Sequence, residues 1–199
     1  DISSTMPVSG KYTAQQKIIY DIVASAHKAA VEALKPGIAF RDIYYLACRT
    51  IVEGMKSIGL MKGDSGEAVA AGAHALFFQC GLGHMMGLDV HDMENLGEVW
   101  VGYNGEPKST QFGIKSLRLA RTLEPGFVLT IEPGVYFIPT LIDMWTAEKR
   151  YAEFINYDKV AEWKNFGGIR NEEDFLITEN GYQILGNPEE KAKLVETYF

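Results

Sequence analysis

The first third of the chain places its apolar residues with the period of an α-helix. From residue 13 onward they recur at spacings of three and four, and Thr13 with Gln16 forms the capping-box pattern that begins helices. Pro36 interrupts this spacing. A second run with the same period covers residues 40–58. We therefore predict two amphipathic helices, over residues 13–34 and 40–58.

The pattern changes in the second half to short apolar runs that are broken by glycine and proline. These runs predict strands rather than long helices, because strands are short and end at such residues. Helices first and strands later favour one α+β domain. The remaining predicted elements are the end of a strand within residues 1–10, strands at 127–131, 134–137 and 175–178, and helices at 68–78, 141–154 and 188–199.

Charge and composition exclude several classes of protein. Nineteen Lys and Arg stand against 26 Asp and Glu, a net charge of −7, which argues against nucleic acid or an anionic membrane as partner. No apolar run approaches the roughly 18 residues of a membrane span. Two cysteines do not make a disulfide framework, so a reducing compartment is expected. The chain begins with Asp1 rather than Met, so we expect its natural N-terminus to lie outside the sequence.

The strongest local signal for chemistry is the glycine-rich stretch 81–92. It contains His84 and His91, which would face opposite sides of a regular strand. Both could serve one site only if the segment bends. Two ordinary loop histidines remain the alternative interpretation.

Carboxylates elsewhere could be partners of these histidines. Glu132 ends an apolar strand, where a buried carboxylate needs a cation or hydrogen-bond donors, although it could also point outward beside the turn. Arg170 and Glu172 are two residues apart and so share one face of a strand, although three acids in a row could be a solvated charge run. An imidazole with several carboxylates suits Mn²⁺ or a similar ion better than a structural zinc site.

Three stretches, residues 80–92, 123–137 and 167–174, together resemble the pita-bread metallopeptidases, a family that includes methionine aminopeptidase, aminopeptidase P and prolidase. Residues 113–121 are most similar to the prolidases. The resemblance implies an α+β pita-bread fold, with a curved antiparallel sheet flanked by helices and its first strands outside the sequence. It implies that residues 1–199 are a C-terminal catalytic domain.

The resemblance also implies a set of metal ligands: Asp1, His84, Glu132 and Glu172. They would hold two divalent ions, with Mn²⁺ expected and Co²⁺ or Zn²⁺ as alternatives. A further aspartate of the family would precede Asp1, outside the sequence. We therefore expect the second metal position to be incomplete in this chain and the chain alone to be a poor or inactive enzyme.

Further roles come from the same resemblance. His91 is expected to contact substrate and stabilise the tetrahedral intermediate, and Glu132 to shuttle a proton. Arg118 and Arg170 are expected around the substrate, with Arg118 on its free carboxylate. Cys80 departs from the family, which usually has a histidine there.

The activity that this resemblance implies is metal-dependent hydrolysis of Xaa-Pro dipeptides. One alternative is an aminopeptidase P, which acts on longer peptides with proline second. The other is a non-catalytic binding domain of the same fold, although such members typically lose metal ligands. The resemblance further implies a homodimer in the full-length protein and a cytoplasmic setting.

Overall fold

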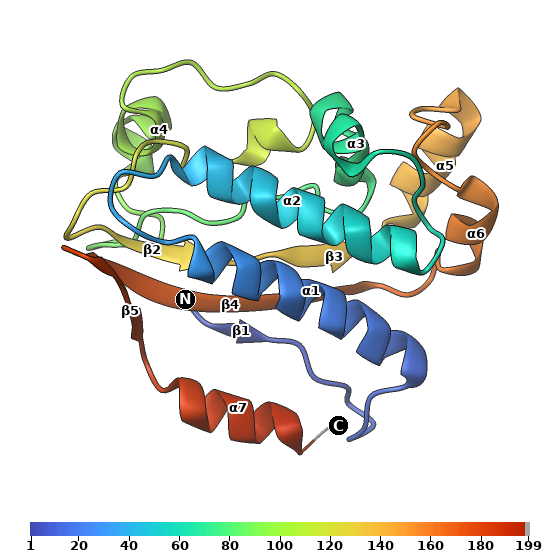
Figure 1. Ribbon diagram of the computed structural model, residues 1–199, viewed down its shortest axis with the longest axis horizontal. Helices are drawn as coiled ribbons and strands as arrows, with labels where there is room; N and C mark the ends of the chain where they lie inside the picture. Colours follow the sequence, from blue (N-terminus) through green and yellow to red (C-terminus); the bar gives the residue numbers. More distant parts are fainter. Residues whose placement is uncertain (198–199) are drawn as a thin grey trace.

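A single long strand organises the sheet. The computed structural model describes residues 1–197, and within that range five strands form an antiparallel sheet around β4. Strands β2 and β3 pair along one edge of β4, and β1 and β5 pair along the other (Figure 1). The strands are β1 (Ser3–Ser4), β2 (Val128–Ile131), β3 (Gly134–Tyr136), β4 (Gly168–Thr178) and β5 (Gly181–Leu185).

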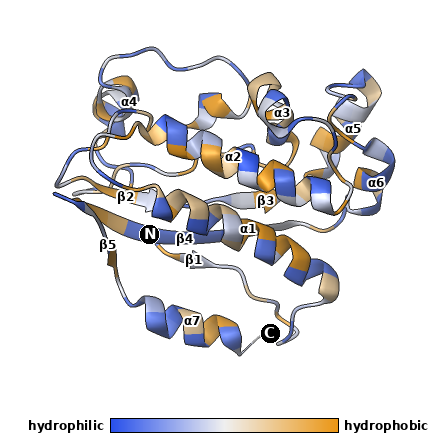
Figure 2. Ribbon diagram, viewed as in Figure 1, coloured by the Kyte–Doolittle hydropathy of each residue, from blue (hydrophilic) through white to orange (hydrophobic). Residues whose placement is uncertain are grey.

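Two long helices cover one face of this sheet. Helix α1 (Ala14–Glu32) lies against the sheet and α2 (Phe40–Ser57) packs beside α1 (Figure 1). The predicted capping box is present, because Thr13 Oγ1 accepts from the Gln16 amide at 3.1 Å while Gln16 Oε1 accepts from the Thr13 amide at 2.9 Å. Hydrophobic and hydrophilic residues alternate along both helices (Figure 2), as the sequence pattern predicted.

The shorter helices depart from the predictions at their ends. The predicted helix 68–78 is divided at Gly72, whose φ of 93° is left-handed. The predicted helix 141–154 ends at Glu148, because Lys149 also adopts a left-handed φ, of 51°. These helices are α3 (Ser65–Ala71), α4 (Glu94–Tyr103), α5 (Pro139–Glu148), α6 (Tyr157–Glu162) and α7 (Pro188–Glu196), with short 3₁₀ turns at Ala73–Leu76 and Ile114–Ser116.

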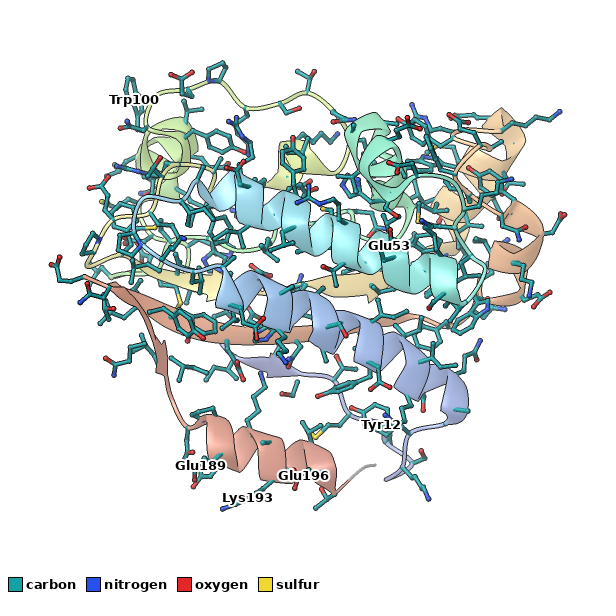
Figure 3. The ribbon with its side chains drawn as sticks, viewed as in Figure 1. Tyr12, Glu53, Trp100, Glu189, Lys193 and Glu196 are labelled. Atoms are coloured by element: carbon teal, nitrogen blue, oxygen red, sulfur yellow. The ribbon has the colours of Figure 1, made fainter. Side chains whose placement is uncertain are left out.

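Several elements were not predicted. Helices α4 and α6 and strand β5 occupy stretches in which the sequence showed no regular period. Strand β4 joins the predicted strand 175–178 to the predicted strand that carries Arg170 and Glu172, so that the two form one continuous element. The predicted helix 188–199 corresponds to α7, whose Glu189 and Lys193 point away from the sheet (Figure 3). The last two residues of that prediction lie outside the described residues.

The two faces of β4 serve different neighbours because side chains alternate along a strand. Glu173 and Phe175 contact His27 of α1, with Glu173 Oε2 at 3.5 Å from His27 Nε2. Arg170 and Glu172 project to the opposite face. The helical layer therefore covers one face, and the other face is available for a site.

The fold class predicted from the sequence is confirmed. Helices pack on an antiparallel sheet, and the fully buried core between them includes Phe40, Tyr44, Phe77 and Phe175. Within residues 1–197, every helix is too short or too polar to pass through a bilayer.

Candidate functional site

The segment that carries His84 runs alongside β2 and is fixed to it by hydrogen bonds. The Thr130 amide donates to the His84 carbonyl at 3.0 Å, and the His84 amide donates to Thr130 Oγ1 at 3.1 Å. A side chain at Gly83 would place its Cβ 2.0 Å from the Thr130 carbonyl oxygen, so glycine is required for this approach. The close pairing brings His84 Nε2 to 3.5 Å from Oε1 of Glu132, the residue that directly follows β2.

Four predicted ligands converge here from four separate segments of the chain. His84 Nε2 lies 3.5 Å from Asp1 Oδ2, and ligand atoms of His84, Glu132 and Glu172 lie within 4.8 Å of one another. His84 and Glu172 are each only 2% exposed. The Ser3 hydroxyl of β1 donates to Glu172 Oε2 at 2.6 Å, which orients that carboxylate. Burial of this many acceptor groups in one place is costly without a cation.

The electrostatics of the cluster match a cation-binding role. His84 Nδ1 lies 3.1 Å from the Met85 carbonyl, which can only accept, so Nδ1 carries the proton and Nε2 presents its lone pair to the acids. Burial raises the pKa of Glu132 to about 7; Arg170 opposes this shift and the charge of Glu172 adds to it. Burial also lowers the pKa of His84. A neutral imidazole beside three carboxylates is a donor set that fits a hard divalent ion.

His91 reaches the same site because its loop turns back on itself. The Asp92 amide donates to the Met85 carbonyl at 3.1 Å, which closes the loop. The His91 and His84 rings lie 4.2 Å apart between centroids, at an angle of 74°. The bend that the sequence left open is therefore present, and the His91 side chain remains 45% exposed.

A cavity of about 280 Å³ opens beside the cluster, lined among others by Cys80, His91, Arg118, Glu132 and Arg170. Arg170 Nη1 lies 3.3 Å from Glu132 Oε2, and Arg170 Nε donates to the Tyr136 hydroxyl at 2.8 Å. Burial raises the pKa of the Cys80 thiol, which keeps it protonated. The predicted substrate residues His91, Arg118 and Arg170 thus line one cavity.

Sequence reasoning missed two residues of this site. Glu94, at the start of α4, forms an ion pair with Arg118 Nη1 and lies 3.8 Å from His91 Nδ1. Tyr136 of β3 holds the Arg170 side chain. The only signal for Glu94 was an acidic residue shortly after the His91 loop, and Tyr136 belonged to a run interpreted only as a strand.

The clustered acids and His84, together with the adjoining cavity, form a candidate metal site. The family described as "Metallopeptidase family M24" matches residues 1–179, and the chain belongs to this family. The pita-bread metallopeptidase resemblance seen in the sequence is thereby confirmed. The roles of individual site residues stay predictions.

Two kinds of family member are similar to this chain in amino-acid sequence. The chain is 39% identical to human "Xaa-Pro dipeptidase" over 93% of this chain and 36% of that protein. It is 34% identical to the "Probable Xaa-Pro aminopeptidase pepP" of Botryotinia fuckeliana, over 98% of this chain and 42% of the relative. The chain therefore spans well under half the length of these relatives.

The fold of this chain is also similar to solved structures of aminopeptidases P. Zinc-substituted Escherichia coli aminopeptidase P in complex with product superposes with a TM-score of 0.71 at 34% identity, over 100% of this chain and 38% of that one. Pseudomonas aeruginosa aminopeptidase PepP gives a TM-score of 0.71 at 30% identity, with the same coverage of 100% and 38%. The pita-bread fold predicted from the sequence is confirmed by this similarity.

Proposed function

We propose that residues 1–199 form the catalytic domain of a metal-dependent exopeptidase that hydrolyses the peptide bond before proline, with Xaa-Pro dipeptides as its main substrates. The observation that carries this proposal is the convergence of Asp1, His84, Glu132 and Glu172 beside a cavity lined by two arginines. The similarity to an Xaa-Pro dipeptidase supports the substrate class.

Those four residues would hold the metal. Their oxygen-rich set favours Mn²⁺, with Co²⁺ or Zn²⁺ as alternatives, and the family resemblance implies a pair of ions. When bound, such ions lower the pKa of a water towards neutrality and polarise a carbonyl. Ser3 and the Met85 carbonyl hold two of the ligands, Glu172 and His84, in their orientations.

Other side chains of the cavity would act on the substrate. The Glu132 carboxylate, which lines the cavity, would take a proton from the attacking water and pass it to the proline nitrogen, which has no hydrogen of its own. His91 faces the cavity and can donate a hydrogen bond to the developing oxyanion. Arg118 can bind the free carboxylate that ends a dipeptide.

A second candidate is an aminopeptidase P activity on longer peptides, which the similarity to the E. coli and Pseudomonas aeruginosa enzymes favours. A non-catalytic binding domain is disfavoured, because each ligand position that the chain covers carries a residue able to ligate.

The two activities differ in their use of a free carboxylate, so Arg118→Ala separates them. In the full-length protein the variant should raise KM for an Xaa-Pro dipeptide about tenfold or more, because a hydrogen bond to a charged group contributes about 1.5–3 kcal/mol. KM for the corresponding Xaa-Pro amide should rise less, because its neutral carbonyl accepts a weaker hydrogen bond from Arg118. Steady-state kinetics on the two substrates measures this.

Arg121→Ala is the matched control, since Arg121 pairs with Glu124 and does not line this cavity. Equal losses for the free and amidated substrates in Arg118→Ala would show that Arg118 is structural and would contradict the dipeptidase assignment.

The setting of the protein is also a proposal. Cys48 is buried and free, and Cys80 is partly buried and free, which fits a reducing compartment such as the cytoplasm. A homodimer of the full-length protein is expected from the family resemblance. Light scattering of the full-length protein would test the dimer.

A further inference from the structure

We propose that Glu94 sets how strongly the site prefers dipeptides over longer peptides, by neutralising part of the charge of Arg118. This inference rests on the proposed function, because it assigns Arg118 to the C-terminal side of an Xaa-Pro substrate. It concerns a residue of α4 that contributes no ligand to the candidate metal cluster.

The pairing of Glu94 with Arg118 is fixed by the way α4 packs. The amide of Ala120 donates to the Gly102 carbonyl at 2.8 Å, and a Cβ at Gly102 would lie 1.7 Å from the Arg118 carbonyl oxygen. The end of α4 therefore touches the backbone of the Arg118 segment directly. At the start of the helix the Glu94 side chain, 18% exposed, meets the Arg118 guanidinium, 41% exposed.

The charges around the cavity are already matched within the chain. Arg170 Nη1 faces Glu132 Oε2 at 3.3 Å, and Arg118 Nη1 faces Glu94. Glu94 Oε2 is also 3.8 Å from His91 Nδ1, so the carboxylate lies beside two residues that line the cavity, His91 and Arg118. Each arginine of the cavity thus has a carboxylate partner before any substrate binds.

This matching affects the two substrate classes differently. The free carboxylate of a dipeptide bound at Arg118 would lie close to the carboxylate of Glu94, and like charges at that distance repel. A longer or amidated peptide places a neutral carbonyl there, which still accepts from the guanidinium without the repulsion. Glu94 therefore penalises dipeptides selectively and widens the range of accepted lengths.

Glu94→Gln isolates the charge, because glutamine keeps an oxygen acceptor for Arg118 and nearly the same volume. Glu98→Gln is the matched control: Glu98 lies on the same helix, and its carboxylate pairs with Lys108 rather than with a cavity residue. The experiment uses the metal-loaded full-length protein and compares kcat/KM for an Xaa-Pro dipeptide and for its amide.

In Glu94→Gln the ratio of kcat/KM for the dipeptide over the amide should rise about three- to tenfold above wild type. Glu98→Gln should leave the ratio unchanged. In the double variant Glu94→Gln with Arg118→Ala the ratio should equal that of Arg118→Ala alone, because the effect of Glu94 acts through Arg118.

An unchanged ratio in Glu94→Gln would overturn the inference, as would an equal loss for both substrates, which would make Glu94 a structural support of Arg118. Failure of the wild type to cleave either substrate would contradict the proposed function instead. The inference would then be decided by calorimetry, from the Kd of an uncleavable reduced-bond Xaa-Pro analogue and of its amide. A three- to tenfold tighter binding of the acid in Glu94→Gln supports it, and an equal Kd overturns it.

Discussion

The two faces of β4 place adjacent glutamates in opposite surroundings. On the face toward α1, Glu173 Oε1 lies 3.1 Å from Lys191 Nζ, and Glu173 Oε2 lies 3.5 Å from His27. On the other face, Glu172 meets the Ser3 hydroxyl and shares its space with His84 and Glu132. Glu173 has a cation from its own chain, whereas Glu172 lies among other candidate metal ligands.

This difference separates a carboxylate that is paired within the chain from one that is a candidate metal ligand. A buried acid that is paired with a lysine contributes to the fold, and replacing both partners together need cost little. A buried acid among other acceptors is costly unless a cation or hydrogen-bond donors compensate its charge. The surroundings of each carboxylate, rather than its place in the run 172–174, therefore indicate its role.

The largest expected effect tests the contrast between Glu172 and Glu173. Glu172→Gln in the full-length protein should lower kcat about 1000-fold or more, because it removes the charge of a proposed metal ligand. Glu173→Gln should keep kcat near wild type but lower the free energy of unfolding by about 1–3 kcal/mol, since Lys191 and His27 lose their partner. Kinetics, bound-metal analysis and thermal unfolding measure the two variants together.

Near wild-type turnover of Glu172→Gln at saturating metal would contradict the assignment of this face. Full loss of turnover in a folded Glu173→Gln would show that both glutamates belong to the chemistry.

On the face of β4 toward α1, His27 should make the stability of the fold depend on pH. Burial lowers the pKa of His27 from 6.5 to about 4, with Glu173 opposing and Lys191 adding to the shift. The unfolded chain therefore takes up this proton more readily than the folded one. The contribution of neutral His27 to stability is complete above pH 6.5 and is lost as the pH falls towards 4, by up to about 3 kcal/mol.

Urea unfolding of wild type and of His27→Gln between pH 7.5 and 4 measures this dependence. The variant should lose less stability over this range than wild type. Parallel curves for the two proteins would mean that His27 is not the group that titrates.

The smallest expected effect is that of a substitution at the start of α1, away from the candidate site. Thr13→Ala removes the hydroxyl that accepts from the Gln16 amide at the start of α1. The free energy of unfolding should fall by about 1 kcal/mol. Xaa-Pro hydrolysis should be unchanged below the melting range. A loss of activity without a loss of stability would show that α1 influences the site through β4.

The helical half of the molecule was predictable because its elements bury a periodic face. Helices α1 and α2 have local start signals and apolar residues at regular spacing. Helix α4 lacks this signal: Leu96 and Trp100 are 74% and 70% exposed, Trp100 points outward (Figure 3), and Gly97 is not helical. A helix that buries few apolar side chains has no regular spacing of apolar residues by which the sequence could predict it.

The candidate ligands were identified by their type and by resemblance, and their convergence needed the structure. Spacing correctly placed Arg170 and Glu172 on one face of β4. No spacing could pair Glu94 with Arg118, because their contact depends on how α4 packs against a loop 24 residues away. Tertiary contacts of this kind leave no local pattern in the sequence.

The pairing of β1 with β4 has a consequence for the order of folding. Ser3 pairs with Glu172 across 169 residues of chain, whereas the α1 and α2 pair is local. Closing so long a loop is slow, and contacts of high sequence separation tend to form late. The helical layer should therefore be able to form before Asp1 and Ser3 reach Glu172. Metal uptake would then report the last step of folding rather than the first, and an early intermediate would be compact but without its site.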